Sequence, residues 1–197
     1  MQARRARYGR RMELPVLETP RLRLRAYRAS DRERVFELYS DPRVVRYWSF
    51  SAWTELAQAD AFLAPLLAPR ADDSDVLPWA IADRATDELI GTTTLFELRR
   101  DQQRAEIGYS LVASRWRGGL AREAVHRVLR FAFDELELRR VEADVDPRNT
   151  ASLVLLDALG FVREGFLRER WNVAGELCDS VVYGLLRREL RTPAAAA

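Results

Sequence analysis

Apolar residues recur along this chain at two spacings, and the switch between them predicts the order of strands and helices. Short alternating or continuous apolar runs predict strands, whereas apolar residues three or four apart predict one buried helix face. The strands predicted in this way are a short one around Leu22 and Leu24, then 76–83, 89–98, 105–112, 139–145, 161–167 and 177–186. The helices predicted in this way are 30–40, 53–67, 119–136 and 149–161.

Polar and small residues mark where these helices begin and end. Ser30 stands three residues before Glu33, which predicts a capping box, and Asp41–Pro42 predicts the end of that helix. Asn149 is placed to cap the last helix, and Gly160 to end it in the left-handed conformation. The chain therefore predicts an α/β (α+β) fold: a mixed, mostly antiparallel, seven-stranded sheet with about four helices.

The length and composition fit one domain. A chain of 197 residues with 48% apolar content can bury a core without disulfide or metal support. We place the domain at residues 14–191, after an arginine-rich tail at 1–13 that we expect to be disordered, and before a frayed tail at 192–197. A second interpretation of the first tail is a nucleic-acid or ribosome contact.

Composition excludes several kinds of site. The chain contains no lysine, so neither a P-loop nor Schiff-base chemistry is possible. One cysteine, Cys178, and one histidine, His126, are too few for a zinc site, and we expect no metal. We find neither an apolar run of membrane-spanning length nor a secretory signal, so we expect a cytoplasmic protein without membrane contact, either a monomer or a homodimer.

The stretch SRWRGGLAREAV at 114–125 indicates an anion site. A strand at 105–112, a helix at 119–136 and a strand at 140–145 form a β-α-β unit, whose strands run parallel. The helix N-termini near Gly119 and Asn149 therefore lie at the same edge of the sheet, where open α/β sheets bind ligands. The two glycines and the surrounding Arg115, Arg117 and Arg122 favour a phosphate. A tight structural turn with solvated arginines is the alternative.

Three segments together carry a family resemblance. AEIGYSL, then WRGGLAREAV, then VDPRNTASLVLLDALGFVREG resemble the GCN5-related N-acetyltransferases (GNAT), specifically the ribosomal-protein-alanine (RimJ/RimL-like) branch. The resemblance runs from about Leu17 to Leu190. It implies acetyl-CoA as co-substrate, a central parallel strand pair that splays apart, and a pantetheine arm that pairs with free backbone around Leu111 and Val112.

In that family the turn has the pattern Gln/Arg-x-x-Gly-x-Gly/Ala and holds the diphosphate through backbone amides. The matching frame here is Trp116-x-x-Gly119-x-Ala121, unless Arg115-x-x-Gly118 is the working register. The residues that the resemblance assigns to acetyl-CoA are Leu111, Val112, Arg117, Gly118, Gly119, Leu120, Ala121, Arg122, Asn149 and Ser152.

Acetyl transfer needs a neutral amine, and this requirement favours one kind of acceptor. An α-amine is about one tenth neutral at pH 7, whereas a lysine amine is neutral in only about one molecule in 2,500. Glu106, where related enzymes place a glutamate, is the expected catalytic base, and Glu97 is the second choice. A strand glutamate in a surface salt bridge is the alternative for Glu106. Ser152, which matches a serine of the ribosomal-protein branch, is the expected proton donor to the leaving thiolate.

The remaining candidates fall into two groups. His126 lies beside the apolar stripe of its helix and we expect it to be structural, as we do Cys178. Four aromatic residues between the first two helices are expected to bind the acceptor, where the family closes over it. Packing of those helices onto the sheet is the alternative. The four residues are Tyr47, Trp48, Phe50 and Trp53.

The leading hypothesis is thus an N-acetyltransferase that uses acetyl-CoA and acts by direct attack in a ternary complex. The acceptor would be a protein or peptide N-terminal α-amine, for example that of a ribosomal protein. A small amine such as an aminoglycoside, a polyamine or an amino acid is the alternative, because acceptor specificity resides in loops. A nucleic-acid or ribosome-binding module that uses the basic tail, and a CoA-binding protein without turnover, are the remaining hypotheses.

Overall fold

A computed structural model describes residues 14–69 and 74–192, so the tail expected at 1–13 and nearly all of that at 192–197 lie outside the described residues. Its strands are β1 (Leu17–Glu18), β2 (Leu22–Arg25), β3 (Leu77–Asp83), β4 (Leu89–Arg99), β5 (Arg104–Leu111), β6 (Arg140–Val145), β7 (Val162–Val173) and β8 (Glu176–Leu186). Its α-helices are α1 (Arg32–Ser40), α2 (Pro42–Val45), α3 (Ala57–Leu67), α4 (Leu120–Asp134) and α5 (Thr150–Leu159).

All the strands form one sheet in the order β1-β2-β3-β4-β5-β6-β8-β7. Every neighbouring pair is antiparallel except β5 and β6, which are parallel as predicted. Within the described ranges the structure has eight strands, all in the sheet, and five α-helices, which is one strand and one helix more than expected. The additions are the two-residue strand β1 and the single-turn helix α2, both too short to produce a periodic pattern.

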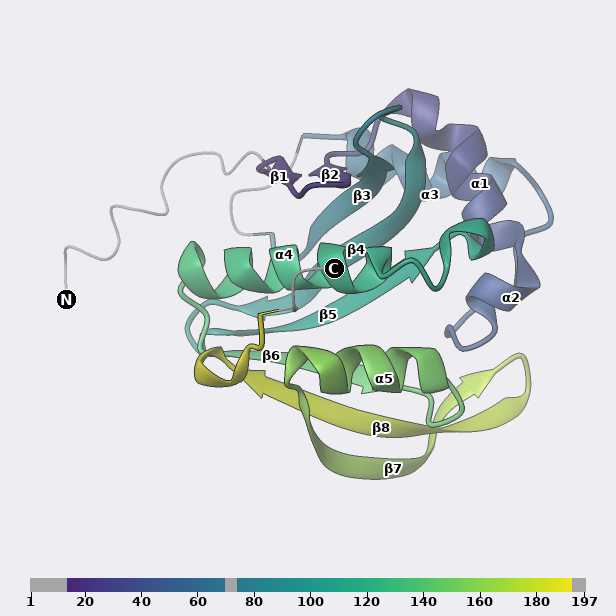
Figure 1. Cartoon of the computed structure of the whole chain (residues 1–197). Helices are drawn as coiled ribbons and strands as arrows, with labels where there is room; N and C mark the ends of the chain where they lie inside the picture. The colour runs from purple at the N-terminus through teal and green to yellow at the C-terminus, as the bar shows by residue number, and fades with distance from the viewer. Residues whose placement is uncertain (1–13, 70–73, 193–197) are drawn as a thin grey trace.

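Helices cover both faces of the sheet, with α4 and α5 on one side and α1 to α3 on the other (Figure 1). Two neighbouring threonines of β4 show the division, since successive strand residues point to opposite faces. The hydroxyl of Thr92 lies 3.1 Å from the Tyr39 hydroxyl of α1. Thr93 is paired in register with Trp79, whose ring meets Phe131 of α4 at 5.6 Å. The core is therefore built in two layers, one on each face.

The entry into α1 corrects one prediction. The capping box expected from Ser30 and Glu33 does not form: α1 begins at Arg32, after a 3-10 turn at Ala29–Asp31. The Asp31 carboxylate accepts the backbone N–H of Arg28 at 2.8 Å and pairs with the buried Arg25 guanidinium at 2.8 Å. Asp31 forms this start of the helix instead of Ser30 because its carboxylate accepts a backbone N–H of the turn and also pairs with a buried cation.

The parallel strands β5 and β6 separate partway along their length. They are paired only from Arg104 opposite Arg140 to Glu106 opposite Glu142. Beyond this point β5 continues to Leu111 and β6 to Val145 with no register between them. The predicted splay is therefore present, and it begins at Glu106.

Candidate active site

The glycine turn at the start of α4 presents unpaired backbone N–H groups. Gly119 directly precedes the helix with φ 73°, and Arg117 is also left-handed at φ 65°. The first helical hydrogen bond runs from Glu123 N–H to the Gly119 oxygen at 3.0 Å. The N–H groups of Leu120, Ala121 and Arg122 precede that bond, so they stay available to a ligand at the positive end of the helix.

A clamp from the turn between β1 and β2 fixes the orientation of the glycine turn. The Arg21 guanidinium donates to the Gly118 oxygen at 2.8 Å and pairs with Glu123 at 2.6 Å. Glu123 also accepts the Thr19 hydroxyl at 2.6 Å. Because the peptide group is planar and trans, the Gly119 N–H points away from the side on which Arg21 holds the Gly118 oxygen. The clamp therefore holds this donor facing outward. Sequence patterns did not reveal it, since its partners are about a hundred residues apart.

The arginines and the tryptophan near the turn have different roles. Arg117 and Arg122 are exposed, and neither forms an ion pair with any residue in the described ranges. Arg115 instead pairs with Asp83 at 3.4 Å. Trp116 Nε1 donates to the Leu111 oxygen at 2.8 Å. The residue that precedes the helix in the left-handed conformation is Gly119, which favours the Trp116-x-x-Gly119-x-Ala121 frame over the alternative register.

The unpaired edge of β5 ends at Leu111, whose oxygen already accepts from Trp116 Nε1, contrary to the expectation that it is free. Val112 N–H donates to the Ile90 oxygen at 2.9 Å, and the Val112 oxygen accepts from Arg115 N–H at 2.9 Å. Both backbone groups of Val112 are thus already used, contrary to the expectation that they are free. Because hydrogen-bonded pairs alternate along antiparallel strands, the backbone groups of Leu111, Tyr109 and Ile107 face away from β4. They face the side on which β6 has separated.

The cap of α5 forms as predicted. The Asn149 side-chain oxygen accepts the backbone N–H of Ser152 at 3.2 Å, and Gly160 ends the helix with φ 95°. Ser152 is therefore held in the first turn of α5, beside the splay. The structure brings this turn and the glycine turn of α4 to the same edge of the sheet, beyond the carboxyl ends of β5 and β6.

Glu106 occupies the last paired position of β5, directly opposite Glu142. Burial, and then the negative charges of Glu142 and Asp144, raise the pKa of its carboxyl group. It forms no ion pair with any residue of the described segments, which argues against the surface salt bridge considered above. Glu97, in contrast, lies in a β-bulge at φ 50° and pairs with Arg99 at 2.7 Å.

The aromatic residues after α1 pack mainly on the first helices. The rings of Trp48, Phe50 and Trp53 lie 4.8–6.0 Å from that of buried Tyr39. Tyr47 contacts the Arg46 guanidinium. The expected packing alternative is thus present, although all four residues remain partly exposed.

A buried chain of hydroxyls joins this cluster to β5. It runs from Tyr39 to Thr92 at 3.1 Å and on to Ser110 at 3.0 Å. Ser110 and Glu106 are four residues apart on one strand, so they point to the same face of the sheet. The aromatic cluster and the candidate base therefore share the face opposite α4 and α5.

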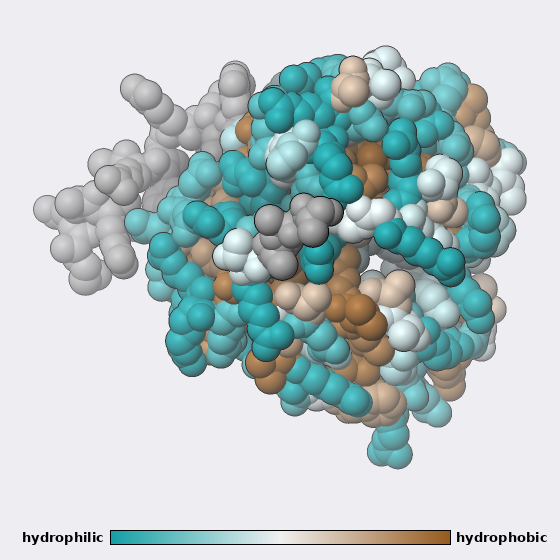
Figure 2. Space-filling view, viewed as in Figure 1, coloured by the Kyte–Doolittle hydropathy of each residue, from teal (hydrophilic) through white to brown (hydrophobic). Residues whose placement is uncertain are grey.

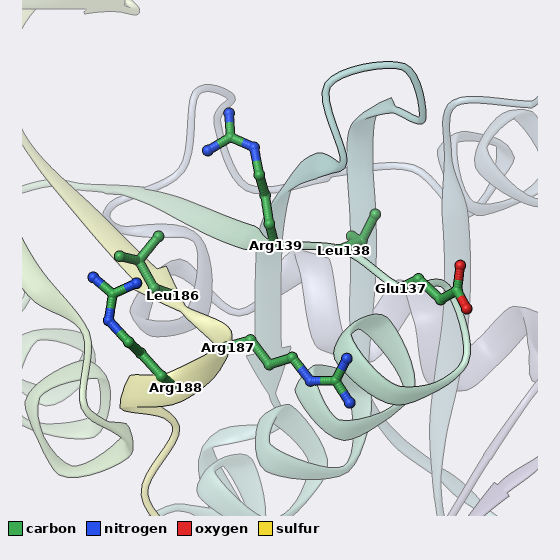
Figure 3. Close-up of a pocket in the computed structure, with 6 residues that line it drawn as sticks. All are labelled: Glu137, Leu138, Arg139, Leu186, Arg187 and Arg188. Atoms are coloured by element: carbon green, nitrogen blue, oxygen red, sulfur yellow. The ribbon is translucent and has the colours of Figure 1, made fainter.

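Two other features lie away from this region. His126 has an unpartnered buried Nε2, and burial lowers the pKa of its imidazole. An open groove of about 550 Å³ lies at the far end of the sheet, where β6 begins and β8 ends (Figure 3). It is lined by Glu137, Leu138, Arg139, Leu186, Arg187 and Arg188. Because the glycine turn follows the other end of β5, this groove is separate from the candidate site.

Comparison with known proteins identifies the family. Residues 21–162 match the model of the acetyltransferase (GNAT) domain, and the chain belongs to this family. An uncharacterized N-acetyltransferase of Bacillus licheniformis, p20, is 35% identical over 89% of this chain and 98% of its own length. YdaF of Bacillus subtilis, named as a candidate ribosomal N-acetyltransferase, is 36% identical over 51% of this chain and 55% of its own length.

A solved structure shows the same fold. Spermidine N-acetyltransferase from Vibrio cholerae, in complex with CoA and spermine, superposes with a TM-score of 0.75 at 22% identity, over 87% of this chain and 98% of that one. The family match and the relatives at 35% identity show that the protein is an N-acetyltransferase with a single GNAT domain. Within residues 14–69 and 74–192, no helix is long and apolar enough to cross a membrane.

Proposed function

We propose that this N-acetyltransferase moves an acetyl group from acetyl-CoA to the α-amine of a protein or peptide N-terminus, within a ternary complex. The observation that carries the proposal is the splay of β5 and β6 at Glu106, with the unpaired N–H groups of α4 at its open edge. The diphosphate would bind these N–H groups together with Arg117 and Arg122. The pantetheine arm would lie along the backbone edge of Ile107 to Leu111.

The two candidate catalytic groups lie on opposite sides of that edge. Glu106 points to the face that carries the aromatic cluster, and Ser152 lies in the first turn of α5 on the other face. The amine would approach from the aromatic face and lose a proton to Glu106, directly or through water. As nitrogen bonds to the carbonyl carbon, the C–S bond breaks with its electron pair on sulfur, which receives a hydrogen bond and its proton through Ser152.

The chemistry of the amine supports an α-amine acceptor. Deprotonation at pH 7 costs roughly 1 kcal/mol for an α-amine and nearly 5 kcal/mol for a lysine amine. A single unpaired glutamate with a raised pKa is a sufficient base for the first acceptor. We further infer a cytoplasmic protein of the ribosomal-protein branch, acting as a monomer or homodimer.

The carboxylates near Glu106 favour a second candidate, a small amine with more than one positive charge. Glu142 and Asp144 share its face of the sheet, and Ser180 donates a hydrogen bond to Asp144. Glu142 is however already bonded to Arg104 at 2.9 Å and to Arg140 at 2.7 Å. Its charge is therefore largely compensated, which ranks a polyamine below the α-amine.

A mass-spectrometric screen tests the proposal. The protein and acetyl-CoA are incubated with N-terminal ribosomal-protein peptides, with the same peptides blocked at the α-amine but containing lysine, and with spermidine. We expect one added acetyl group on the free peptides and stabilisation of the protein by acetyl-CoA in thermal unfolding. Preferential acetylation of spermidine would show that the acceptor is a polyamine and not an N-terminal α-amine. Neither stabilisation nor transfer to any amine would refute the proposal.

A further inference from the structure

Three buried polar atoms among the described residues have no hydrogen-bond partner: Thr93 Oγ1, Tyr109 Oη and His126 Nε2. A buried hydroxyl without a partner costs free energy, which makes each of them a candidate for a role that the fold alone does not explain. His126 lies on α4, where burial and then the charges of Arg130 and Arg127 lower the pKa of the imidazole. Tyr109 is different, because it belongs to the unpaired edge of β5.

The position of Tyr109 follows from the register of three strands. Trp79, Thr93 and Tyr109 are successive partners across β3, β4 and β5, so their side chains share one face of the sheet. Trp79 on that face packs against Phe131 of α4. Tyr109 therefore points toward the layer of α4 and α5, where apolar residues gather on the surface shown in Figure 2.

Ser152 lies close to the Tyr109 hydroxyl. Burial raises the pKa of this phenol to about 12, and the Ser152 side chain opposes the shift only in part. Tyr109 therefore stays protonated at any pH at which the enzyme works, and its O–H can only donate or accept a neutral hydrogen bond. A serine hydroxyl can accept one hydrogen bond and donate its own proton to another group at the same time.

We propose that Tyr109 is a positioning residue for acetyl transfer: its hydroxyl donates to Ser152 Oγ and thereby aims the Ser152 O–H at the sulfur of the thioester. The inference rests on the function proposed above. The bond that breaks is C–S, and its electron pair goes to sulfur. The chain of hydrogen bonds from Tyr109 through Ser152 stabilises that charge, since linked hydrogen bonds polarise one another.

The substitution Tyr109→Phe separates this role from packing, because it removes the hydroxyl and keeps the ring. We expect kcat to fall about tenfold, the size of one hydrogen bond, with the KM for acetyl-CoA changed less than about twofold. The melting temperature should fall by no more than about 4 °C, the effect of losing one hydrogen bond while the ring stays packed. Thr93→Val is the matched control: it removes a second unpartnered hydroxyl from the same face, and kcat should not change.

A double-mutant cycle tests whether Tyr109 acts through Ser152. In a Ser152→Ala background, Tyr109→Phe should change kcat by less than about twofold, because the shared hydrogen bond is already gone. Unchanged kcat in Tyr109→Phe, or additive effects with Ser152→Ala, would each overturn the inference. With an active wild-type enzyme, such results leave the proposed function standing. A wild-type protein without acetyl transfer would overturn both.

Discussion

Replacing Glu106 by glutamine tests the assignment of the base, because it removes the carboxylate while keeping the shape of the side chain. Glu106 has no ion-pair partner in the described part of the chain, so the substitution leaves no cation unpaired. Burial and the neighbouring Glu142 raise the pKa of Glu106. Its protonated form is therefore favoured at a higher pH than for an ordinary glutamate, and wild-type activity should fall as pH drops through that raised pKa.

The size of the loss follows from the protonation of the acceptor. Without a base the enzyme can use only neutral amine, which is about one tenth of an α-amine at pH 7 and more than about nine tenths at pH 9. The part of the Glu106→Gln defect that arises from amine protonation is therefore about tenfold at pH 7 and nearly absent at pH 9. For a lysine amine the corresponding factors are about 2,500 and about 25.

The assay is kcat/KM for a free N-terminal peptide at a series of pH values, for wild type, Glu106→Gln and Glu97→Gln. The Glu97 carboxylate is already paired with Arg99 at 2.7 Å, so its substitution should leave the pH dependence unchanged. Glu142→Gln should move the acidic limb of the wild-type profile to lower pH, because it removes a negative charge that raises the pKa of Glu106. A Glu106→Gln defect of equal size at pH 7 and pH 9, or no defect, would refute the assignment.

Further substitutions test the turn and the fold. Gly119→Ala adds a Cβ at φ 73°, beside the N–H groups expected to bind the diphosphate, and should raise the KM for acetyl-CoA about tenfold in steady-state assays. Gly175→Ala, at φ 91° with nothing within 4 Å, carries similar backbone strain and should leave KM unchanged. Asp31→Ala removes the carboxylate that pairs with both terminal nitrogens of the buried Arg25 guanidinium and leaves it paired only with Asp87, at 3.2 Å, among the described residues; this should cost about 1.5–3 kcal/mol in denaturant unfolding. Asp60→Ala removes an exposed ion pair with Arg32 and should cost less than about 1 kcal/mol; equal losses in the two variants would contradict this account of burial.

Several long elements of this fold could be predicted from sequence because each carries its own periodicity. Strand β7 is an exception: it was predicted to end at 167 but runs to Val173, because it is exposed at nearly every position and carries no alternating pattern, and α3 begins at Ala57 rather than at 53. The apolar stripe of α4 and the strand pattern of β5 are local signals, and their observed bounds differ from the predicted ones by at most two residues. The cap at Asn149 was found because capping acts within one turn. The false capping box at Ser30 shows the limit, since the competing Asp31 is selected by Arg25, a cation buried by tertiary structure.

The site could be located from sequence but not assembled. The parallel pairing of β5 and β6 follows from the β-α-β order, and the family resemblance implies their splay. The clamp of Arg21 on Gly118 and Glu123 instead joins segments about a hundred residues apart. The bonds that occupy Val112 depend on the register of β4, which no local pattern encodes. The role proposed for Tyr109 carries no sequence signal either, because it depends on the surroundings of its buried hydroxyl, which only the packed structure shows.

A crystal structure of the protein with CoA tests the central claim most directly. The account predicts the diphosphate on the backbone N–H groups from Gly119 to Arg122, and the pantetheine arm along the edge of β5 that β6 leaves unpaired beyond Glu106. Binding of CoA in the arginine-lined groove at the opposite end of the sheet, with the glycine turn empty, would contradict it.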